Sequence, residues 1–562
     1  MGLYLNGKKA SLLYKDETES TYFVDKSALL DELIPLVLTR EQRENIPVEE
    51  EKCMGKSNKY LCITRPRRFG KSVAANMIAA FFGKGRDCRP VFDHLTVSTR
   101  SWYSAHLNQH NVIFISFNSI PEGCTSYRQY INRISRRILR DLIQAYPAAG
   151  IDENDAVWDA LNDILESEEE DVKFIFVLDE WDFIFHRDFV TGQDKEEYVD
   201  FLSNLLKDQP YVEFAYMTGI LPIAKYSSGS ELNMFYEYTI TSEERFSQYF
   251  GFTEEEVDTL FARYQARTED QNITREGLRT WYDGYHIKGG GRVYNPRSVV
   301  AALTNNNLGN YWTSAGPYDE IFYYVRHGAE DLRETLGLMI SGIPVQANIQ
   351  EYAAVSMTLH NQDEILSAMV VYGFLSYENG CVSIPNKELM DKFSDMLKKE
   401  SSLGYIHQLA RESEKMLQAT LENDTATMLK ILEFAHNTEV PLLTYNNETD
   451  LTAVVNLVYL SARDFYRIER EDKAGTGYVD FIFYPEVNRN NDGIILELKV
   501  NHTADEALQQ IKDKKYALKF EGKIGERPLY TGRILGVGIA YNKETKKHTC
   551  KIEILRNAQK PL

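Results

Sequence analysis

A short basic loop between an apolar run and a helical pattern contains residues that could hold a phosphate. Residues 60–82 read YLCITRPRRFGKSVAANMIAAFF. Gly70 would let backbone N–H groups approach phosphate oxygens, Lys71 would reach the terminal phosphates, and the Ser72 hydroxyl would ligate Mg²⁺. Gly-Lys-Ser also occurs by chance in turns that cap surface helices, but the strand before and the helix after this loop favour a nucleotide site.

Three arginines add positive charge to the same loop: Arg65, Arg67 and Arg68. They are concentrated where a triphosphate would lie, so we expect all three to bind the nucleotide, with ATP as the cofactor. Arg65 stands where a glycine usually opens a phosphate-binding loop, and Pro66 biases it toward an extended conformation. The loop therefore departs from the usual motif at its first position.

A second group of acidic residues follows a buried strand pattern. Residues 173–182 read KFIFVLDEWD. Asp179 at the end of this strand would hold Mg²⁺, and Glu180 beside it would orient or deprotonate the attacking water. An ordinary strand end before an acidic turn would give the same letters, but the separation from the basic loop fits an ATPase sheet. The next strand pattern ends in Thr218, which we expect to sense the γ-phosphate.

A separate charged group lies near the C-terminus. Residues 476–484 (TGYVDFIFY) and 493–501 (GIILELKVN) read as two strands joined by a polar turn, that is, a hairpin. Glu497 and Lys499 share one face, and the pairing can bring Asp480 beside them. Asp480 and Glu497 would bind Mg²⁺, with Mn²⁺ as a substitute, and Lys499 would position the attacking water. Exposed strands often carry such charges. Here the flanking residues are apolar, and charged side chains in an otherwise apolar strand indicate a functional role.

Composition places these groups in a multidomain globular protein. The chain has 562 residues, 43% of them hydrophobic, and six cysteines without paired spacing. We expect reduced, structural thiols in a cytoplasmic protein, and no apolar run approaches the length of a membrane span. Residues 441–562 hold 19 Lys and Arg against 17 Asp and Glu, although the whole chain carries −20. This asymmetry favours a polyanionic partner for the last segment, with a solvated charged face as the alternative.

Several strings together resemble the bacterial AAA-ATPase-like family, in which Arg-Pro-Arg-Arg-Phe-Gly-Lys replaces the glycine-opened loop. The strings, between about residues 10 and 300, are YFVDK, RPRRFGKS, VLDEWD, MTGI, FGFTEEEV, WYDGYHI and VYNPRSV. The resemblance makes Arg65 a family trait. Residues 111–118 also read as a buried strand and 127–145 as an amphipathic helix with a basic face, and this alternation of strand and helix implies a parallel sheet. The resemblance implies that a lid or winged-helix-like region follows the sheet.

The C-terminal group resembles the PD-(D/E)XK nuclease superfamily over about residues 440–545. The resemblance implies three further positions: Glu448 as an additional metal carboxylate, Gln510 as a catalytic residue, and Tyr516 near the active site. One departure is Tyr478, where many relatives have arginine, and this would alter phosphate contacts. The metal carboxylates themselves are retained.

We therefore expect an α/β protein with four parts. These are an N-terminal P-loop ATPase core with a parallel sheet (1–235), a helical or winged lid (236–345), a helical connector (346–440) and an α/β restriction-endonuclease-like domain (441–562). The predicted activity is ATP binding and hydrolysis coupled to Mg²⁺-dependent cleavage of nucleic acid, DNA in preference to RNA. Such an enzyme would suit defence or mobile-element biology.

A second function class fits the same sequence. In that alternative the protein is a nucleotide-switched signalling or scaffold ATPase, and its nuclease-like domain only binds nucleic acid or a partner. Incubation with plasmid and Mg²⁺ or Mn²⁺, with and without ATP, distinguishes the two. The sequence is compatible with a homo-oligomer, and we expect no membrane partner.

Overall fold

The structure is a computed structural model of the whole chain. It describes residues 2–37, 59–168, 172–223, 231–242, 244–312, 329–349, 361–436, 448–474, 477–485, 491–520 and 532–558. The chain divides into two compact units. The first is Met1–Ala315 with Asn348–Asn379, and the second is Gly316–Ala347 with Gly380–Leu562. The four-part division expected from the sequence stays a prediction.

A five-stranded sheet forms the centre of the first unit, in the order β2-β3-β4-β1-β5. All four neighbouring pairs are parallel, which confirms the predicted parallel sheet. Parallel sheets are covered on both faces, and β1 and β3 are accordingly buried along their whole length. The strands are β1 (Tyr60–Thr64), β2 (Asn111–Ser116), β3 (Phe174–Asp179), β4 (Val212–Gly219) and β5 (Tyr236–Tyr238).

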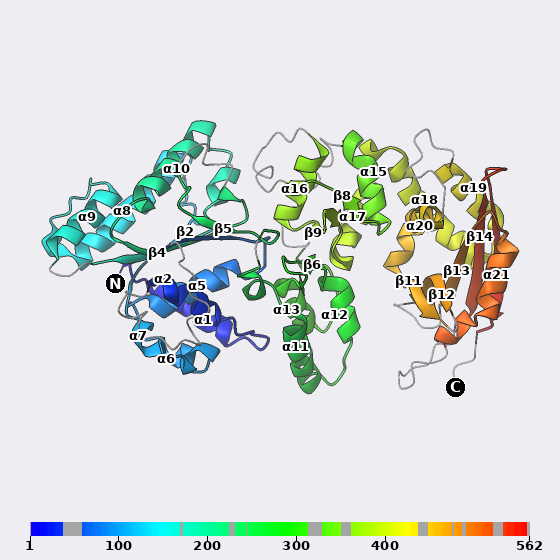
Figure 1. Ribbon diagram of the computed structural model, residues 1–562, viewed down its shortest axis with the longest axis horizontal. Helices are drawn as coiled ribbons and strands as arrows, with labels where there is room; N and C mark the ends of the chain where they lie inside the picture. Colours follow the sequence, from blue (N-terminus) through cyan, green and yellow to red (C-terminus); the bar gives the residue numbers. More distant parts are fainter. Residues whose placement is uncertain are drawn as a thin grey trace. The chain divides into compact units, whose positions relative to one another are not determined.

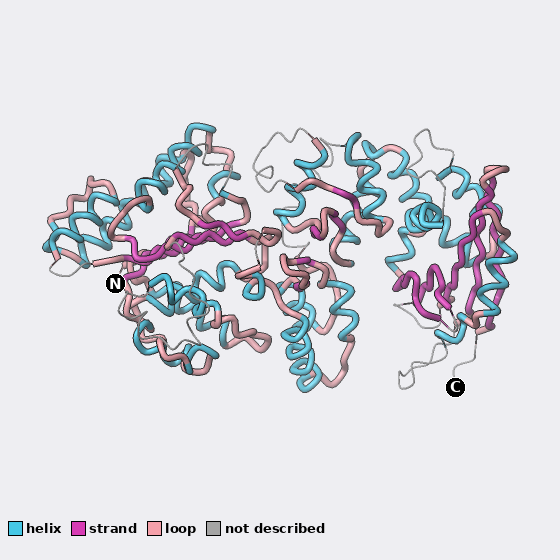
Figure 2. Tube along the Cα trace, viewed as in Figure 1, coloured by secondary structure: helices cyan, strands magenta, loops and turns pink. Residues whose placement is uncertain are grey.

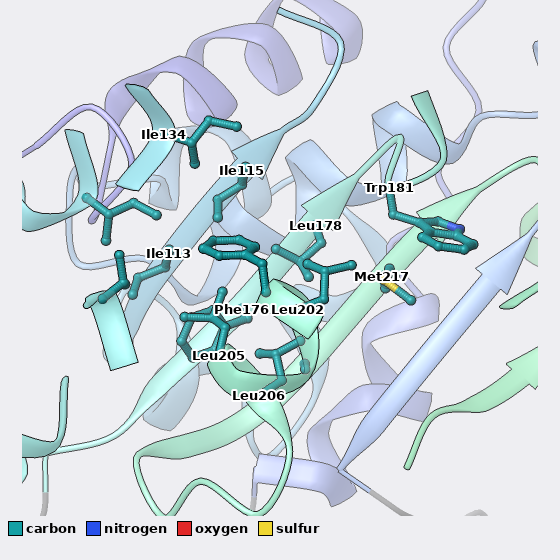
Figure 3. Close-up of a cluster of buried hydrophobic side chains, with 14 of the residues drawn as sticks. Ile113, Ile115, Ile134, Phe176, Leu178, Trp181, Leu202, Leu205, Leu206 and Met217 are labelled. Carbon is teal, nitrogen blue, oxygen red and sulfur yellow. The ribbon is translucent and has the colours of Figure 1, made fainter. Parts of the chain in front are cut away.

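Helices cover both faces of this sheet (Figure 1), as the cyan helices on either side of the magenta strands in Figure 2 also show. The side chains of β3 alternate: Phe176 and Leu178 join the core with α8, α9 and α10, and Ile175 and Val177 join the core with α1, α2 and α5. Figure 3 shows the first core, where Phe176 lies near Leu202 of α10. The helices are α1 (Lys8–Thr18), α2 (Leu29–Val37), α5 (Lys71–Phe82), α6 (Arg89–Phe92), α7 (Tyr103–His106), α8 (Tyr127–Ala145), α9 (Val157–Ser167) and α10 (Gly192–Leu206).

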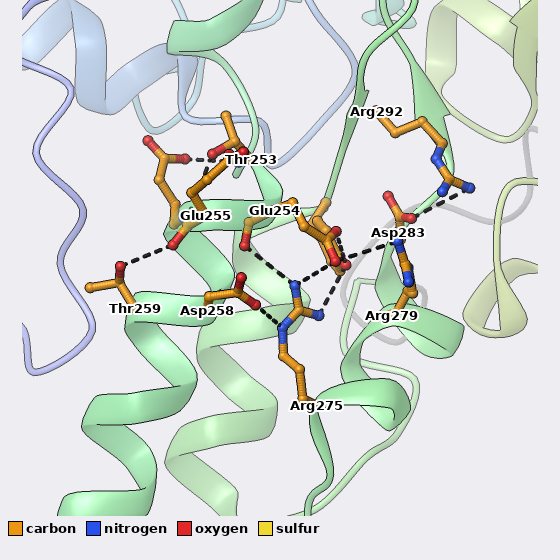
Figure 4. Close-up of polar contacts among 11 residues, drawn as sticks. Thr253, Glu254, Glu255, Asp258, Thr259, Arg275, Arg279, Asp283 and Arg292 are labelled. Carbon is orange, nitrogen blue, oxygen red and sulfur yellow. Dashed lines mark hydrogen bonds and ion pairs between the residues drawn. The ribbon is translucent and has the colours of Figure 1, made fainter.

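A helical region with a small hairpin completes the first unit. Polar contacts tie its helices together, because Arg275 of α12 pairs with Glu254 at 2.9 Å and with Asp258 at 2.6 Å, both on α11 (Figure 4). The elements are α11 (Glu254–Arg267), α12 (Arg275–Tyr282), β6 (Tyr285–His286), β7 (Arg292–Val293), α13 (Pro296–Asn305), α16 (Gln362–Tyr372) and β9 (Ser376–Glu378). This region follows β5 in sequence and contacts the basic loop described below.

The second unit contains a mixed five-stranded sheet in the order β11-β12-β13-β14-β15. Only the β13–β14 pair is parallel among these strands, and α21 connects the two. Leu508 and Ile511 of α21 pack on Ile495 of β13. The strands are β11 (Tyr466–Ala474), β12 (Gly477–Pro485), β13 (Gly493–Val500), β14 (Ile534–Asn542) and β15 (Lys547–Arg556), and β8 (Val345–Gln346) pairs with β10 (Cys381–Ser383). The helices are α15 (Ala329–Ile340), α17 (Lys387–Lys399), α18 (Tyr405–Glu422), α19 (Thr425–His436), α20 (Glu448–Val458) and α21 (Ala504–Asp513).

The longest helices of the structure carry charged residues, which bears on the expectation that the chain has no membrane span. The long helices α8 and α18 span 19 and 18 residues, and both carry charged residues along their length. Within the described ranges, no helix combines the length and the apolar character needed to cross a membrane.

Candidate functional site

The basic loop connects the buried strand β1 to helix α5, as its sequence predicts. Gly70 caps the helix with a φ of 87°, in the left-handed region that favours glycine. The helix has no side-chain cap at this end, so its first N–H groups suit an anion. Arg68 also has a positive φ, 71°. Strained backbone of this kind in a non-glycine residue occurs preferentially at functional sites.

Lys71 is buried at the start of α5, with 7% of its surface exposed. Its Nζ donates to the carbonyl oxygens of Arg65 and Pro66, each at 2.8 Å. Burial lowers the pKa of Lys71 to about 8, and the nearby carboxylates of Asp182 and Asp179 oppose this shift. The ammonium group therefore rests on the loop's own carbonyls, where a phosphate could replace them as its partner.

The three loop arginines lie in different environments. Arg65 is buried, and its Nη1 donates to the carbonyl oxygens of Thr64 and Tyr238 at 2.8 Å while the guanidinium stacks over the Phe250 ring. This side chain ties the start of the loop to β5. Arg67 is half-buried, and Arg68 is exposed. The expected contacts of all three arginines with a nucleotide stay a prediction.

The acidic pair lies where β3 ends, beside the loop. Asp179 is buried and hydrogen-bonded to the Ser72 side chain; burial and the neighbouring Glu180 raise its pKa to about 6. Its Oδ1 has no hydrogen-bond partner among the described residues. A buried carboxylate oxygen left without a partner next to a serine hydroxyl fits a divalent cation. Glu180 is half-buried and has a φ of 54°, so its backbone is also strained.

Thr218 lies at the end of β4, directly opposite Asp179 in the sheet. Its side chain is buried, and its Oγ1 donates to the carbonyl oxygen of Ile63 at 2.8 Å. The hydroxyl therefore bonds to the neighbouring strand. The expected contact with a γ-phosphate stays a prediction.

The C-terminal group lies on the predicted hairpin of β12 and β13, which pair antiparallel. Glu497 is 2% exposed, and Lys499 Nζ lies 3.2 Å from its Oε1. Gln510 of α21 donates to the same oxygen. Asp480 accepts the backbone N–H of Leu498 at 2.7 Å. The two-residue period and the hairpin register thus bring together side chains from two strands and a helix.

The electrostatics around Glu497 fit a cation. Burial and the neighbouring Asp480 raise the pKa of Glu497 to about 7, and Lys499 opposes this shift. Its Oε2 is buried and has no hydrogen-bond partner among the described residues. One or two carboxylates, together with substrate phosphates, can hold Mg²⁺ or Mn²⁺. Two neighbouring carboxylates, one of which has a buried oxygen without a hydrogen-bond partner among the described residues, suit such a cation.

Comparisons with known proteins match the two segments that contain these sites. The family described as "Predicted AAA-ATPase" matches residues 52–228, and the PD-(D/E)XK nuclease superfamily matches residues 447–549. The chain joins an AAA-ATPase-like domain to a PD-(D/E)XK nuclease superfamily domain. This confirms both resemblances seen in the sequence.

Two individual proteins are also similar to the chain. An uncharacterized protein in the vnfD 5′ region of Azotobacter chroococcum is 28% identical over 275 residues, which is 45% of this chain and 47% of the relative. The chain therefore spans about half the length of that relative. A solved Walker-type ATPase of Pyrococcus abyssi is 13% identical, with a TM-score of 0.36 over 64% of this chain and 95% of the other.

Two nuclease-domain positions are only partly described. Glu448 is the first residue of α20, but its side chain lies outside the described residues, as does that of Tyr478. Among the described residues no cluster of three or more His, Cys, Asp and Glu side chains is arranged for a metal. The described metal set is therefore the pair Asp480 and Glu497. Tyr516 is buried and hydrogen-bonded to Gln510, so it supports the side chain that contacts Glu497.

Asp182 is a residue of the AAA-ATPase-like site that the sequence reasoning missed. Its Oδ2 accepts the backbone N–H groups of Ile220 and Leu221 at 3.0 and 2.8 Å. It is also the leading carboxylate neighbour of Lys71. A Cβ on Gly219 would come within 2.5 Å of Asp182 Oδ1, so glycine allows this close approach. The signal was a third carboxylate in VLDEWD, but its backbone partners lie 38 and 39 residues away.

Proposed function

We propose that this protein is an ATP-hydrolysing enzyme coupled to a Mg²⁺-dependent nuclease that cleaves nucleic acid, DNA in preference to RNA. The observation that carries the nuclease part is the buried, unpartnered Oε2 of Glu497 among the described residues. The site around it brings together Asp480, Lys499 and Gln510. A site that only bound nucleic acid would have no use for a buried carboxylate whose ionisation burial opposes.

Each nuclease-domain residue has a distinct part in this proposal. Asp480 and Glu497 would hold the metal, which when bound polarises the scissile phosphate and lowers the pKa of a bound water. Lys499, beside Glu497, would position the attacking water and stabilise negative charge on the phosphate. Gln510 donates to Glu497 Oε1 and so fixes the carboxylate's orientation.

The AAA-ATPase-like domain would bind ATP through the loop and the helix start. Lys71 would leave the carbonyls of Arg65 and Pro66 for the β and γ phosphates, and Ser72 and Asp179 would hold Mg²⁺. Glu180 would orient or deprotonate the attacking water. Oriented donors at the N-terminus of α5 would complete the anion site.

The deciding experiment is a nicking assay on supercoiled plasmid with Mg²⁺ or Mn²⁺, with and without ATP. Asp480→Asn keeps the shape of the side chain but removes its charge, and we expect it to abolish cleavage. Asp513→Asn, at an exposed carboxylate of α21, is the matched control and should cleave normally. Absence of metal-dependent cleavage of any DNA or RNA by folded wild-type protein would contradict the proposal and favour a nucleotide-switched scaffold.

A further inference from the structure

Helix α8 of the AAA-ATPase-like domain has one strongly basic face. We call the exposed arginines of this helix the arginine face: Arg128, Arg133, Arg136, Arg137 and Arg140. The opposite side of the helix is apolar and buried in the core above the sheet, with Ile134, Ile138 and Leu142 among its members. The arginine face is therefore held in place by the fold.

The charges on this face are not neutralised within the described chain. None of the five arginines has a hydrogen-bond or ion-pair partner among the described residues. The one acidic residue of α8, Asp141, is buried and accepts the backbone N–H groups of Tyr4 and Leu5. Helix α9 carries exposed carboxylates at Asp159 and Asp163, but neither forms an ion pair with the arginine face.

This arrangement costs the folded protein stability. Arg133 and Arg137 are four residues apart, as are Arg136 and Arg140, and like charges at this spacing repel each other on a helix. The chain as a whole has a net charge of −20, so the cluster does not follow from its composition. A partner that supplies negative charge would remove the repulsion.

We propose that the arginine face of α8 binds the phosphate backbone of nucleic acid. Every basic residue of α8 is an arginine and none is a lysine. The planar guanidinium group of arginine matches phosphate oxygens with two parallel hydrogen bonds. From Arg133 to Arg140 the helix rises about 10 Å. Successive phosphates of a strand rise about 3.4 Å along a duplex axis, so the face spans about three of them. This inference rests on the proposed function in one respect: the proposed nuclease activity is the reason for taking nucleic acid as the polyanion.

An anionic membrane fits this helix less well. A helix that lies on a membrane inserts an apolar face between the lipids. The apolar face of α8 is already buried against the sheet, and residues such as Tyr130 and Ile138 are about 1% exposed. Only the charged face remains for a partner, which is what binding to a phosphate backbone requires.

The parent protein in this test is the full chain carrying Asp480→Asn, which allows binding to be measured without cleavage. One variant adds the set Arg133→Gln, Arg136→Gln, Arg137→Gln and Arg140→Gln. The matched control adds four exposed, scattered changes in the same unit: Lys9→Gln, Lys84→Gln, Arg267→Gln and Lys288→Gln. Fluorescence anisotropy gives the Kd for a labelled DNA duplex between about 50 and 200 mM NaCl.

We expect the arginine-face variant to bind DNA roughly 10- to 100-fold more weakly than the parent, and its salt slope to fall by about 3 to 4. The control should stay near the parent, and ATP affinity should be unchanged in all three proteins. Equal losses in variant and control, or a loss without a change of slope, would overturn the proposal. So would unchanged DNA affinity with lost binding to phosphatidylserine vesicles.

The same proteins separate this inference from the proposed function. If the wild-type protein does not nick DNA but the parent loses affinity through the arginine-face changes, the nuclease proposal fails and the α8 contact is supported. If the wild-type protein nicks DNA and the arginine-face variant binds as tightly as the parent, the α8 contact is overturned and the nuclease proposal remains.

Discussion

Replacing Glu497 by glutamine should stabilise the metal-free nuclease domain at pH 8 and leave its stability nearly unchanged at pH 4, below the unfolded pKa. Burial and Asp480 raise the pKa of Glu497 from 4.5 to about 7. Between these values the folded protein keeps a proton that the unfolded chain has lost, so stability falls as the pH rises from about 4.5 to 7. The side chain is only 2% exposed, so solvent screens it little.

The size of the effect follows from the pKa shift. One pKa unit corresponds to about 1.4 kcal/mol, so ionising Glu497 costs the folded domain up to about 3 kcal/mol. Glutamine carries no charge and avoids this cost. Glu497→Gln should therefore gain roughly 1 to 3 kcal/mol over wild type at pH 8 without metal. Added Mg²⁺ should reverse the order, because only the carboxylate of the wild-type protein binds it well.

The assay must report on the second unit alone. The tryptophans all lie in the first unit, the last of them at Trp312, so tryptophan fluorescence does not follow the nuclease domain. Hydrogen exchange of peptides from β13 and β14, corrected for intrinsic rates, follows it directly. At pH 8 with EDTA we expect roughly 10- to 100-fold greater protection in the variant.

A second glutamate of the same unit provides the matched control for this test. Glu544→Gln changes an exposed glutamate of the same unit and should match wild type at both pH values. Equal protection of Glu497→Gln and wild type at pH 8 would refute the reasoning. That result would mean that the buried carboxylate is as well solvated as in the unfolded chain.

Three further predictions concern single residues. Lys71→Ala should abolish ATP binding in a folded protein, measured by calorimetry, and retained affinity would refute the phosphate-loop assignment. Glu180→Gln should keep ATP affinity but lose at least about 100-fold in turnover, and identical behaviour of the two variants would show that the separation of roles is wrong. Gly219→Ala should destabilise the AAA-ATPase-like domain by more than about 1 kcal/mol, because its Cβ would meet Trp181 and Asp182 at 2.5 Å. Unfolding monitored by tryptophan fluorescence measures this loss, and an unchanged unfolding midpoint would show that the close approach is not needed.

The sequence determined the elements whose signals are local. The strand, loop and helix around Lys71 follow from a short apolar run, a glycine at the end of the basic loop and an apolar-rich helical pattern. The grouping of Asp480, Glu497 and Lys499 follows from the two-residue period of strands and from a hairpin connection. In each case the interacting residues are neighbours along the chain or across one pair of strands, so spacing alone predicts them.

Only the tertiary structure decided where the side chains of the loop point. Arg65 bonds to the carbonyl of Tyr238 and stacks on Phe250, residues more than 170 positions away. Asp182 holds the backbone at Ile220, and no pattern near either residue marks the other. Such contacts arise when the parallel sheet brings distant strand ends together. A single sequence indicates individual strands such as β1 and β3, but it does not by itself fix their order in the sheet or the partners that this order creates.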